Sequence, residues 1–255
     1  MKRIKLVVAY DGTNYCGWQV QPNGETVEGV LNRELSNLLG EEIKVTGASR
    51  TDSGVHSLGN VAVFDTETRI PPEKICYALN QRLPEDIVVQ HSCQVADDFH
   101  PRHCNSRKTY EYRILNRTFG MPTRRLDTYF FYRKLDVEAM KRGASYIEGT
   151  HDFKSFCSAN SPVEDTVRTV YAVDVEKQDD IITIRVTGSG FLYNMVRIIA
   201  GTLIQVGLKE IVPEAIPAIL EAKDRGAAGP TAPAHGLTMI GIAFEDESLN
   251  VYKLQ

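Results

Sequence analysis

Two segments contain residue types that could do chemistry, and each lies next to an apolar run. Residues 11–19 (DGTNYCGWQ) contain the only tryptophan of the chain. Residues 48–56 (ASRTDSGVH) carry an arginine, Arg50, two positions before an aspartate, Asp52. In an extended segment, residues two apart share one face, so this guanidinium and this carboxylate would project together. The Ser-Gly pair that follows allows a sharp turn that exposes the aspartate to a reacting group.

Asp52 has the properties of a candidate nucleophile. Burial favours the neutral form of a carboxyl group, whereas a neighbouring arginine keeps it ionised. Pairs of this kind are often only structural. These residues alone therefore leave both a catalytic and a structural role open.

Residues 6–13 (LVVAYDGT) invite comparison with haloacid dehalogenase-type phosphatases, in which an apolar strand ends in Asp-x-Asp-Gly-Thr. The nucleophilic carboxylate of that motif would stand at position 9, which is Ala9 here. A covalent phosphoryl transfer would therefore have no acceptor. A tight turn with a packing tryptophan is the alternative interpretation of this segment.

The charge distribution is uneven. The net charge is −4, but residues 101–134 carry nine basic and two acidic side chains, so the other 221 residues carry −11. Aromatic residues alternate with these cations: Tyr110, Tyr112, Tyr129, Phe130, Phe131 and Tyr132. This alternation suits phosphate contacts combined with stacking on bases. A solvated surface whose aromatic rings face the core is the other interpretation.

The elements that must position these residues follow one order twice. The first half predicts strands over 4–10, 43–48, 60–65 and 87–95, with helices over 26–39 and 71–82. The second half predicts strands over 109–115, 167–175, 181–186 and 237–244, with helices over 136–147 and 191–206 and an added helix over 213–223.

This order is typical of an α+β protein with two tandem ferredoxin-like β-α-β-β-α-β halves, residues 1–105 and 106–255. The halves would form an extended antiparallel sheet with helices on one face and a central cleft. Residues 226–236 (GAAGPTAPAHG) are flexible in composition and predict a loop near that cleft.

Cysteine usage and hydropathy indicate a cytoplasmic protein. The five cysteines are scattered without a close pair, which fits reduced thiols better than disulfides. No secretory signal or membrane span is visible. Four histidines are the main candidates for metal ligands: His56, His100, His151 and His235. No metal site is expected, because no cysteine or carboxylate stands at ligand spacing from any of them. Contact with an RNA backbone or hydrogen bonding within loops is the expected role of these histidines.

Residues 50–56 (RTDSGVH) closely resemble the Arg-Thr-Asp-Ala/Ser-Gly-Val-His signature of the tRNA pseudouridine synthase A family, also called pseudouridine synthase I. The departures are small: Ala48 before the signature, Ser53 within it and Pro101 in a later block. None of them touches a reacting group. Six further blocks resemble the family in order: 10–19 (YDGTNYCGWQ), 99–102 (FHPR), 108–113 (KTYEYR), 149–156 (GTHDFKSF), 191–197 (FLYNMVR) and 234–237 (AHGL).

The resemblance implies the pseudouridine synthase fold with an RNA-binding central cleft. It implies an isomerase that converts uridine to pseudouridine in the anticodon stem-loop of tRNAs, at positions 38, 39 and 40, without a cofactor. It further implies a homodimer in which one tRNA contacts both subunits.

The resemblance also assigns roles to residues. Asp52 is the catalytic residue, and attack on C1′, addition to the base and glycal formation all remain open as its mode of action. Tyr110 would stack on the uracil and could help to move the C5 proton. Arg50 would contact phosphate and help to splay the target nucleotide out of the helix. Arg197 could pair with Asp52 across the cleft and keep it ionised.

Further residues would complete the binding surface. Phe191 and Leu237 would form pocket walls, although a plain core role is an alternative for both. Arg102, Arg107 and Lys108 would contact RNA phosphates. The main rivals are an RNA-binding protein without chemistry and a cofactor-free hydrolase that uses Asp52. The combination of Asp52, Arg50, Tyr110 and Arg197 argues against the first rival, and the lack of a partner histidine motif argues against the second.

Overall fold

The computed structural model describes residues 1–250 and divides into two compact units. Unit 1 comprises Met1–Ser106 together with the C-terminal segment that begins at Met239, and unit 2 comprises Arg107–Thr238. The halves predicted over 1–105 and 106–255 are defined by element order rather than by compactness, and they stay a prediction.

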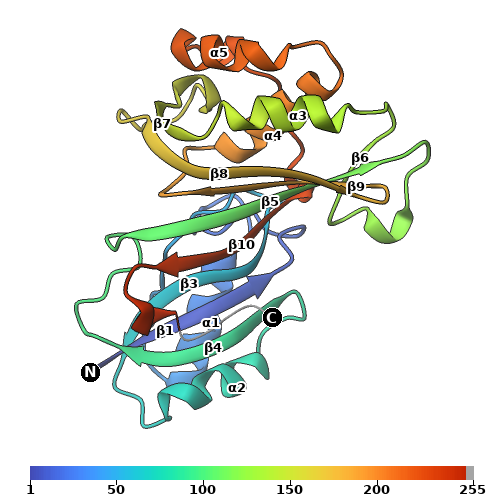
Figure 1. Cartoon of the computed structure of the whole chain (residues 1–255). Helices are drawn as coiled ribbons and strands as arrows, with labels where there is room; N and C mark the ends of the chain where they lie inside the picture. The colour runs from blue at the N-terminus through green and yellow to red at the C-terminus, as the bar shows by residue number, and fades with distance from the viewer. Residues whose placement is uncertain (251–255) are drawn as a thin grey trace. The chain divides into compact units, whose positions relative to one another are not determined.

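The sheet of unit 1 has the strand order β4-β1-β3-β10, and β2 also pairs with β3 (Figure 1). The pairs β1–β3, β1–β4 and β2–β3 are antiparallel. The elements are β1 (Lys2–Tyr10), α1 (Val27–Leu39), β2 (Thr46–Gly47), β3 (His56–Thr66), α2 (Ile75–Asn80) after a 3-10 turn (Pro72–Lys74), β4 (Ile87–Val95) and β10 (Leu237–Phe244), which begins in unit 2.

Capping residues fix both ends of helix α1, and its apolar residues share one face. The Thr26 hydroxyl accepts a hydrogen bond from the Gly29 N–H (3.2 Å), which caps the amino end. Gly40 closes the helix in the left-handed conformation, with φ 69°. The buried face carries Val27, Val30, Leu31 and Leu35 at helical spacing.

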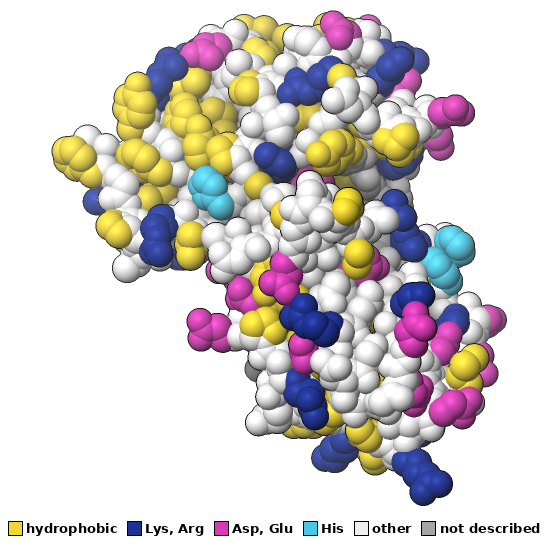
Figure 2. All heavy atoms as spheres, turned by 180° about the vertical axis from the view of Figure 1, so that it is seen from behind, with side chains coloured by type: hydrophobic (Ala, Val, Ile, Leu, Met, Phe, Trp, Pro, Cys, Tyr) yellow, Lys and Arg dark blue, Asp and Glu magenta, His cyan; other side chains and the backbone are white. Residues whose placement is uncertain are grey.

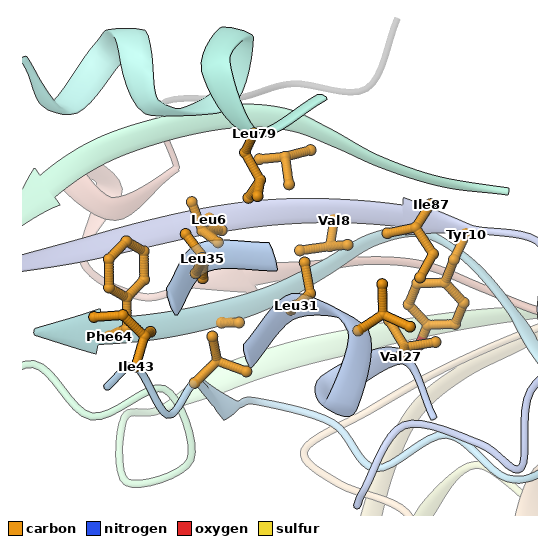
Figure 3. Packing of buried hydrophobic residues seen from close by; sticks show 14 of the residues in the cluster. Leu6, Val8, Tyr10, Val27, Leu31, Leu35, Ile43, Phe64, Leu79 and Ile87 are labelled. Carbon is orange, nitrogen blue, oxygen red and sulfur yellow. The ribbon is translucent and has the colours of Figure 1, made fainter. Parts of the chain in front are cut away.

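The main core of unit 1 lies between one face of its sheet and both helices (Figure 3). Leu6, Val8 and Tyr10 alternate along β1; Leu6 lies near Leu79 of α2, and Tyr10 lies near Val27 of α1 (Figure 3). All of these side chains are at most 5% exposed. Both helices of unit 1 therefore cover the same face of its sheet, as predicted.

The second face of this sheet is covered partly by the C-terminal segment. Val61 and Val63 of β3 pack in a small cluster with Phe99 and Phe244, whose rings lie 5.5 Å apart at 76°. Lys5 is also buried here, and its ammonium group donates to the carbonyl of Leu249. Burial lowers the pKa of Lys5.

The sheet of unit 2 has the order β5-β9-β8-β7, with antiparallel pairs, and β6 adds to the end of β5 in parallel. Helices α3 and α4 pack against each other: a Cβ on Gly143 would lie 3.2 Å from a Leu203 methyl. The elements are β5 (Ser106–Asn116), β6 (Tyr129–Phe131), α3 (Val137–Ser145), β7 (Gly149–Asp152), β8 (Val167–Gln178), β9 (Ile181–Gly188), α4 (Met195–Gly207) and α5 (Ile216–Ala222). Short 3-10 turns lie at Pro122–Arg124, Lys154–Phe156, Pro213–Ala215, Arg225–Ala227, Ala234–Gly236 and Glu247–Leu249.

The predicted α+β class is confirmed, and each predicted helix and long strand is present within a few residues. The strand predicted over 43–48 is reduced to Thr46–Gly47. Ile43 and Val45 are buried as a strand pattern requires, but their N–H groups donate to side chains of α1, Ser36 and Asn32. The short strands β6 and β7 were not predicted, because three or four residues carry too little periodicity. Within residues 1–250, no helix is both long and apolar enough to cross a membrane.

Glu111 on β5 forms an ion pair with Arg185 on the neighbouring strand β9, and this pair should stabilise unit 2. Its buried carboxylate accepts from Arg113 Nε (2.7 Å) and from Arg185 Nη2 (2.8 Å) on β9. Burial would raise the pKa of Glu111, but the hydrogen bonds from Arg185 and Arg113 outweigh it and lower the pKa. A lowered folded-state pKa stabilises the protein above the unfolded-state pKa, and this contribution is lost as the pH falls through the folded-state value.

We therefore expect Glu111→Gln to lower the free energy of unfolding by about 2 kcal/mol at neutral pH. The difference from the wild type should shrink as the pH falls through the lowered pKa of Glu111, below the ordinary range of a glutamate, where the wild-type carboxylate becomes protonated. Urea unfolding followed by circular dichroism measures both effects. Exposed Glu221 on α5 provides the control, because Glu221→Gln should change neither value. A pH-independent difference for Glu111→Gln would contradict this account.

Candidate active site

Asp52 lies in a loop, residues 48–55, between β2 and β3 of unit 1. A buried asparagine on β3, Asn60, holds the start of this loop: its Oδ1 accepts from Ser49 N (3.3 Å) and its Nδ2 donates to Ser49 O (3.0 Å). The Thr51 hydroxyl is 2.7 Å from the Tyr10 hydroxyl. Thr51 is thus turned into the unit, while Arg50 is exposed and Asp52 is half-buried. This alternation is the one expected of an extended segment.

A tight turn follows Asp52, as the Ser-Gly pair predicts. Val55 N donates to Asp52 O (3.1 Å), and Gly54 adopts φ 76°, a conformation that glycine takes without strain. Ser53 at the turn is exposed. The carboxylate of Asp52 is therefore presented at a defined turn rather than on a free loop.

Residues 11–19, the first motif of the sequence, support this loop, and we call them the cradle. Trp18 N donates to Thr51 O (3.0 Å). The Tyr15 carbonyl accepts from Gly54 N (3.3 Å) and from the Ser53 hydroxyl (3.2 Å). The two motifs that stood apart in the sequence are thus one hydrogen-bonded structure around Asp52.

Two glycines of the cradle allow this close approach. A Cβ on Gly12 would lie 2.1 Å from the carbonyl oxygen of Val55. Gly17 has φ 85°, and a Cβ there would lie 2.6 Å from Thr51 O. Both distances are far shorter than a van der Waals contact, so a side chain at either position would displace the Asp52 loop.

Asp11 has a local role in the cradle. Its Oδ1 accepts from the N–H (2.9 Å) and the hydroxyl (2.6 Å) of Thr13 and lies 3.1 Å from His56 Nδ1. Burial would raise the pKa of Asp11, but the hydrogen bonds from Thr13 and the proximity of His56 lower it. These contacts are those of a tight turn, the alternative interpretation of this segment.

The cradle also borders a cavity of about 470 Å³ that is lined partly by Asn14, Tyr15 and Asp86. The Tyr15 hydroxyl donates to Asp86 Oδ1 (2.5 Å), and burial together with this bond raises the pKa of Tyr15. Asp52 is not among the residues that line this cavity.

Four of the predicted substrate-binding residues lie in unit 2: Tyr110, Phe191, Arg197 and Leu237. Tyr110 on β5 is 7% exposed, and its ring packs edge-on against Phe191 with centroids 5.2 Å apart. Leu237, at the start of β10, is buried. On the neighbouring part of β5, the Tyr112 hydroxyl donates to Pro233 O (2.8 Å). The structure thus brings Tyr110 and Phe191 together.

Arg197 lies in the first turn of α4 and is held by two acceptors. Its Nε donates to Ala232 O (2.8 Å) and its Nη1 to Asn194 Oδ1 (2.6 Å). The loop predicted to be flexible, 226–236, is seated on this helix: Gly229 N donates to the Thr202 hydroxyl (2.9 Å). Its glycine content serves close packing, which the composition alone does not reveal.

Several cations of the basic stretch, residues 101–134, are paired with carboxylates. Four of its arginines pair with carboxylates: Arg113 with Glu111, Arg117 with Asp180, Arg124 with Asp127 and Arg133 with Glu210. Arg102 and Arg107 are exposed and form no ion pair with a described residue, and Lys108 is half-buried. Arg107 lies over the exposed ring of Tyr171, 4.7 Å from its centroid.

Some aromatic rings of the basic stretch face the core, and others are exposed and could stack on bases. Tyr110 and Tyr112 are buried, whereas Phe130 is 39% and Tyr132 is 70% exposed. Figure 2 shows hydrophobic side chains at the surface beside lysines and arginines. Exposed rings among cations remain available for stacking.

The histidines take part in loop contacts. His56 Nδ1 accepts from Gly12 N (3.0 Å), and the His151 ring lies 2.8 Å from Glu148 O. The His100 ring stacks on His103 at 3.8 Å. Among the described residues, no group of three His, Cys, Asp or Glu is arranged to hold a metal ion. Sequence reasoning missed Asn60 and Asn194, the side chains that hold the Asp52 loop and Arg197; their only signal is a polar residue inside an apolar pattern.

The sequence profile of the tRNA pseudouridine synthase family matches residues 6–103 and 144–245. The chain belongs to this family, and the predicted enzyme class, an isomerase that forms pseudouridine, is confirmed.

Relatives named tRNA pseudouridine synthase A are similar over nearly the whole chain. That of Thermoanaerobacter sp. (strain X514) is 50% identical, and that of Acetivibrio thermocellus 47%, each over 96% of this chain and 100% of the relative. That of Halalkalibacterium halodurans is 48% identical over 93% of this chain and 90% of the relative. Among solved structures, a chain of a Cbf5-Nop10-Gar1 complex aligns with a TM-score of 0.33 and 16% identity, over 95% of this chain and 51% of that one.

Proposed function

We propose that this chain converts uridine to pseudouridine in the anticodon stem-loop of tRNA, at positions 38 to 40, with Asp52 as its catalytic residue and no cofactor. The observation that carries the proposal is the Asp52 loop. Its signature sequence forms a turn that presents a carboxylate, and the cradle, Tyr10 and Asn60 hold it by hydrogen bonds. The relatives named for tRNA support the substrate class.

The reaction needs an ionised carboxylate. The N1–C1′ bond breaks, the uracil turns while it is held, C5 bonds to C1′, and a proton leaves C5. Asp52 can attack C1′, add to the base or remove a proton to form a glycal, and each route begins from the carboxylate form. Arg197 supports that form through its positive charge.

The other residues act on binding. Tyr110 covers the face of the uracil, and Phe191 and Leu237 shape the pocket walls. Arg50, exposed beside Asp52, contacts phosphate and helps to expose the target nucleotide, because a stacked base is out of reach.

Pseudouridine mapping on unmodified tRNA transcripts tests the proposal. Carbodiimide labelling and primer extension should give new stops in the anticodon arm after incubation with the protein. Transcripts in which uridines 38 to 40 are replaced by cytidine should give none. Tight tRNA binding without any stop would support instead the RNA-binding protein without chemistry.

Arg102 and Arg107 give a separate prediction about binding. Arg102→Ala and Arg107→Ala should each weaken tRNA binding about 3- to 10-fold and reduce the slope of log Kd against log salt concentration by about one. Filter binding at several salt concentrations measures this slope. Arg133→Ala is the matched control, because Arg133 already pairs with Glu210 (2.9 Å) and should contribute less. An unchanged slope for both variants would remove them from the phosphate-contacting surface.

Two further parts of the proposal concern assembly and location. The protein acts as a homodimer, and the exposed apolar rings of Phe119 (76%) and Tyr132 (70%) support an interface of this kind. Sedimentation measures the oligomeric state. It acts in the cytoplasm, which agrees with five free cysteine thiols.

A further inference from the structure

Asn194 has an unusual backbone conformation for its place in the fold. It precedes α4 directly, with φ 62° and ψ 7°, in the left-handed region. The other described non-glycine residues with positive φ lie where this conformation is routine: Asp179 in the β8–β9 turn, and Lys209 and Lys223 after helix ends. A residue that begins a helix is normally extended. The left-handed conformation is less favourable than the extended one for a residue with a side chain, and side-chain contacts can maintain it.

The side chain of Asn194 does not do what an asparagine usually does at this position. It makes no capping hydrogen bond to the first turn of α4. Instead its Oδ1 accepts from Arg197 Nη1 (2.6 Å), and its Nδ2 donates to the Ser158 hydroxyl (2.7 Å). Ser158 N in turn donates to Tyr193 O (3.1 Å). The carboxamide is therefore fixed at both ends.

Arg197 receives a second restraint from the loop seated on α4. Its Nε donates to Ala232 O (2.8 Å), and its own carbonyl accepts from Ala232 N (3.1 Å). An unrestrained arginine has many rotamers, and ordering it during the reaction would cost conformational entropy. Two acceptors in different directions remove this freedom before substrate binds.

We propose that Asn194 is a positioning residue, which orients the guanidinium of Arg197 for the isomerisation. This inference rests on the proposed function, in which Arg197 supports the Asp52 carboxylate. Asn194 acts through Arg197 and through its own anchor, Ser158. In the left-handed conformation of Asn194, the carboxamide hydrogen-bonds to both partners.

Two substitutions of Asn194 distinguish positioning of Arg197 from a general effect on protein stability. Asn194→Gly keeps the left-handed backbone without strain and removes the carboxamide. Asn194→Asp keeps an acceptor for Arg197 and loses the donor to Ser158. We expect Asn194→Gly to lower the single-turnover rate about 10- to 30-fold, with the Kd for tRNA within about twofold of wild type. Asn194→Asp should recover the rate to within about threefold of wild type.

Asp179→Gly is the matched control. Asp179 is another left-handed polar residue (φ 53°), in a turn away from the motifs, so its substitution should leave both values unchanged. A wild-type rate in Asn194→Gly would overturn the proposal. So would a loss that Asn194→Asp does not recover, or one in which the rate, the affinity for tRNA and the melting temperature fall together.

A spectroscopic measurement tests the positioning independently of the reaction. In ¹⁵N-arginine NMR spectra, the Arg197 guanidinium, assigned with Arg197→Lys, should show slow rotation in the wild type and in Asn194→Asp. It should show fast rotation in Asn194→Gly. Equal rotation in all three would overturn the proposal, whatever the protein does to tRNA. A wild-type protein that forms no pseudouridine but shows this pattern would refute the proposed function alone.

Discussion

An Asp52→Asn variant should bind tRNA about as tightly as the wild type and form no measurable pseudouridine, a loss of at least about 10⁴-fold in turnover. The amide has nearly the size of the carboxylate, so the loop and its hydrogen bonds can persist. It carries no negative charge and is a poor nucleophile, so none of the three routes open to Asp52 can begin. Pseudouridine mapping measures turnover, and filter binding measures affinity.

Asn60→Asp provides a comparison in the same unit. It replaces an amide by a carboxylate, the reverse of Asp52→Asn, in a residue that holds the Asp52 loop. It should weaken the loop's support and lower turnover only in part. A fully active Asp52→Asn enzyme would refute the catalytic assignment. Loss of tRNA binding in Asp52→Asn would assign the aspartate to recognition rather than to chemistry.

Gly17→Ala should lower turnover about 100-fold, because it forces the Asp52 loop to move. The new Cβ would lie 2.6 Å from Thr51 O, the acceptor of the bond from Trp18 N. A loop displaced by even a fraction of an ångström no longer presents the carboxylate at the correct position. Single-turnover kinetics at saturating protein measure the effect on the chemical step.

Gly40→Ala is the matched control for backbone strain. Gly40 also has positive φ, 69° against 85° for Gly17, but a Cβ there meets nothing within 4 Å. Backbone strain should lower the free energy of unfolding by about 1 kcal/mol in both variants, and the contact with Thr51 O should add to this loss in Gly17→Ala alone. Only Gly17→Ala should also lose activity. Equal activities for the two variants would contradict the idea that the cradle positions Asp52.

The long helices and strands could be predicted from the sequence, because their apolar pattern repeats over many residues. The turn of the loop that carries Asp52 could also be predicted. The apolar alternation of β1 and the capped pattern of α1 each specify one face, and burial enforces it. The Ser-Gly pair after Asp52 predicted the turn, because few other residues adopt the φ of Gly54. These features depend on neighbours in the sequence.

Other features depend on partners far along the chain, and no local pattern reveals them. The strand predicted over 43–48 is shortened because Ile43 and Val45 donate to side chains of α1. The helix predicted from residue 191 starts at Met195, since Asn194 is turned toward Arg197 and Ser158. The pairing of Arg117 with Asp180 and of Arg133 with Glu210 could not be predicted, because both carboxylates lie outside the basic stretch.

The composition of unit 1 from two distant parts of the chain has a consequence for folding during synthesis. The core between β1, β3 and the two helices is complete once residue 106 has left the ribosome. The opposite face, with Val61 and Val63, obtains Phe244 only after more than half of the chain has followed. Until then Phe99 covers this face only in part, and the edge of β3 that pairs with β10 is open. The contact of Phe244 with Val61 and Val63 is therefore expected to form late in folding. Because it joins distant parts of the chain, the entropy of loop closure limits its rate.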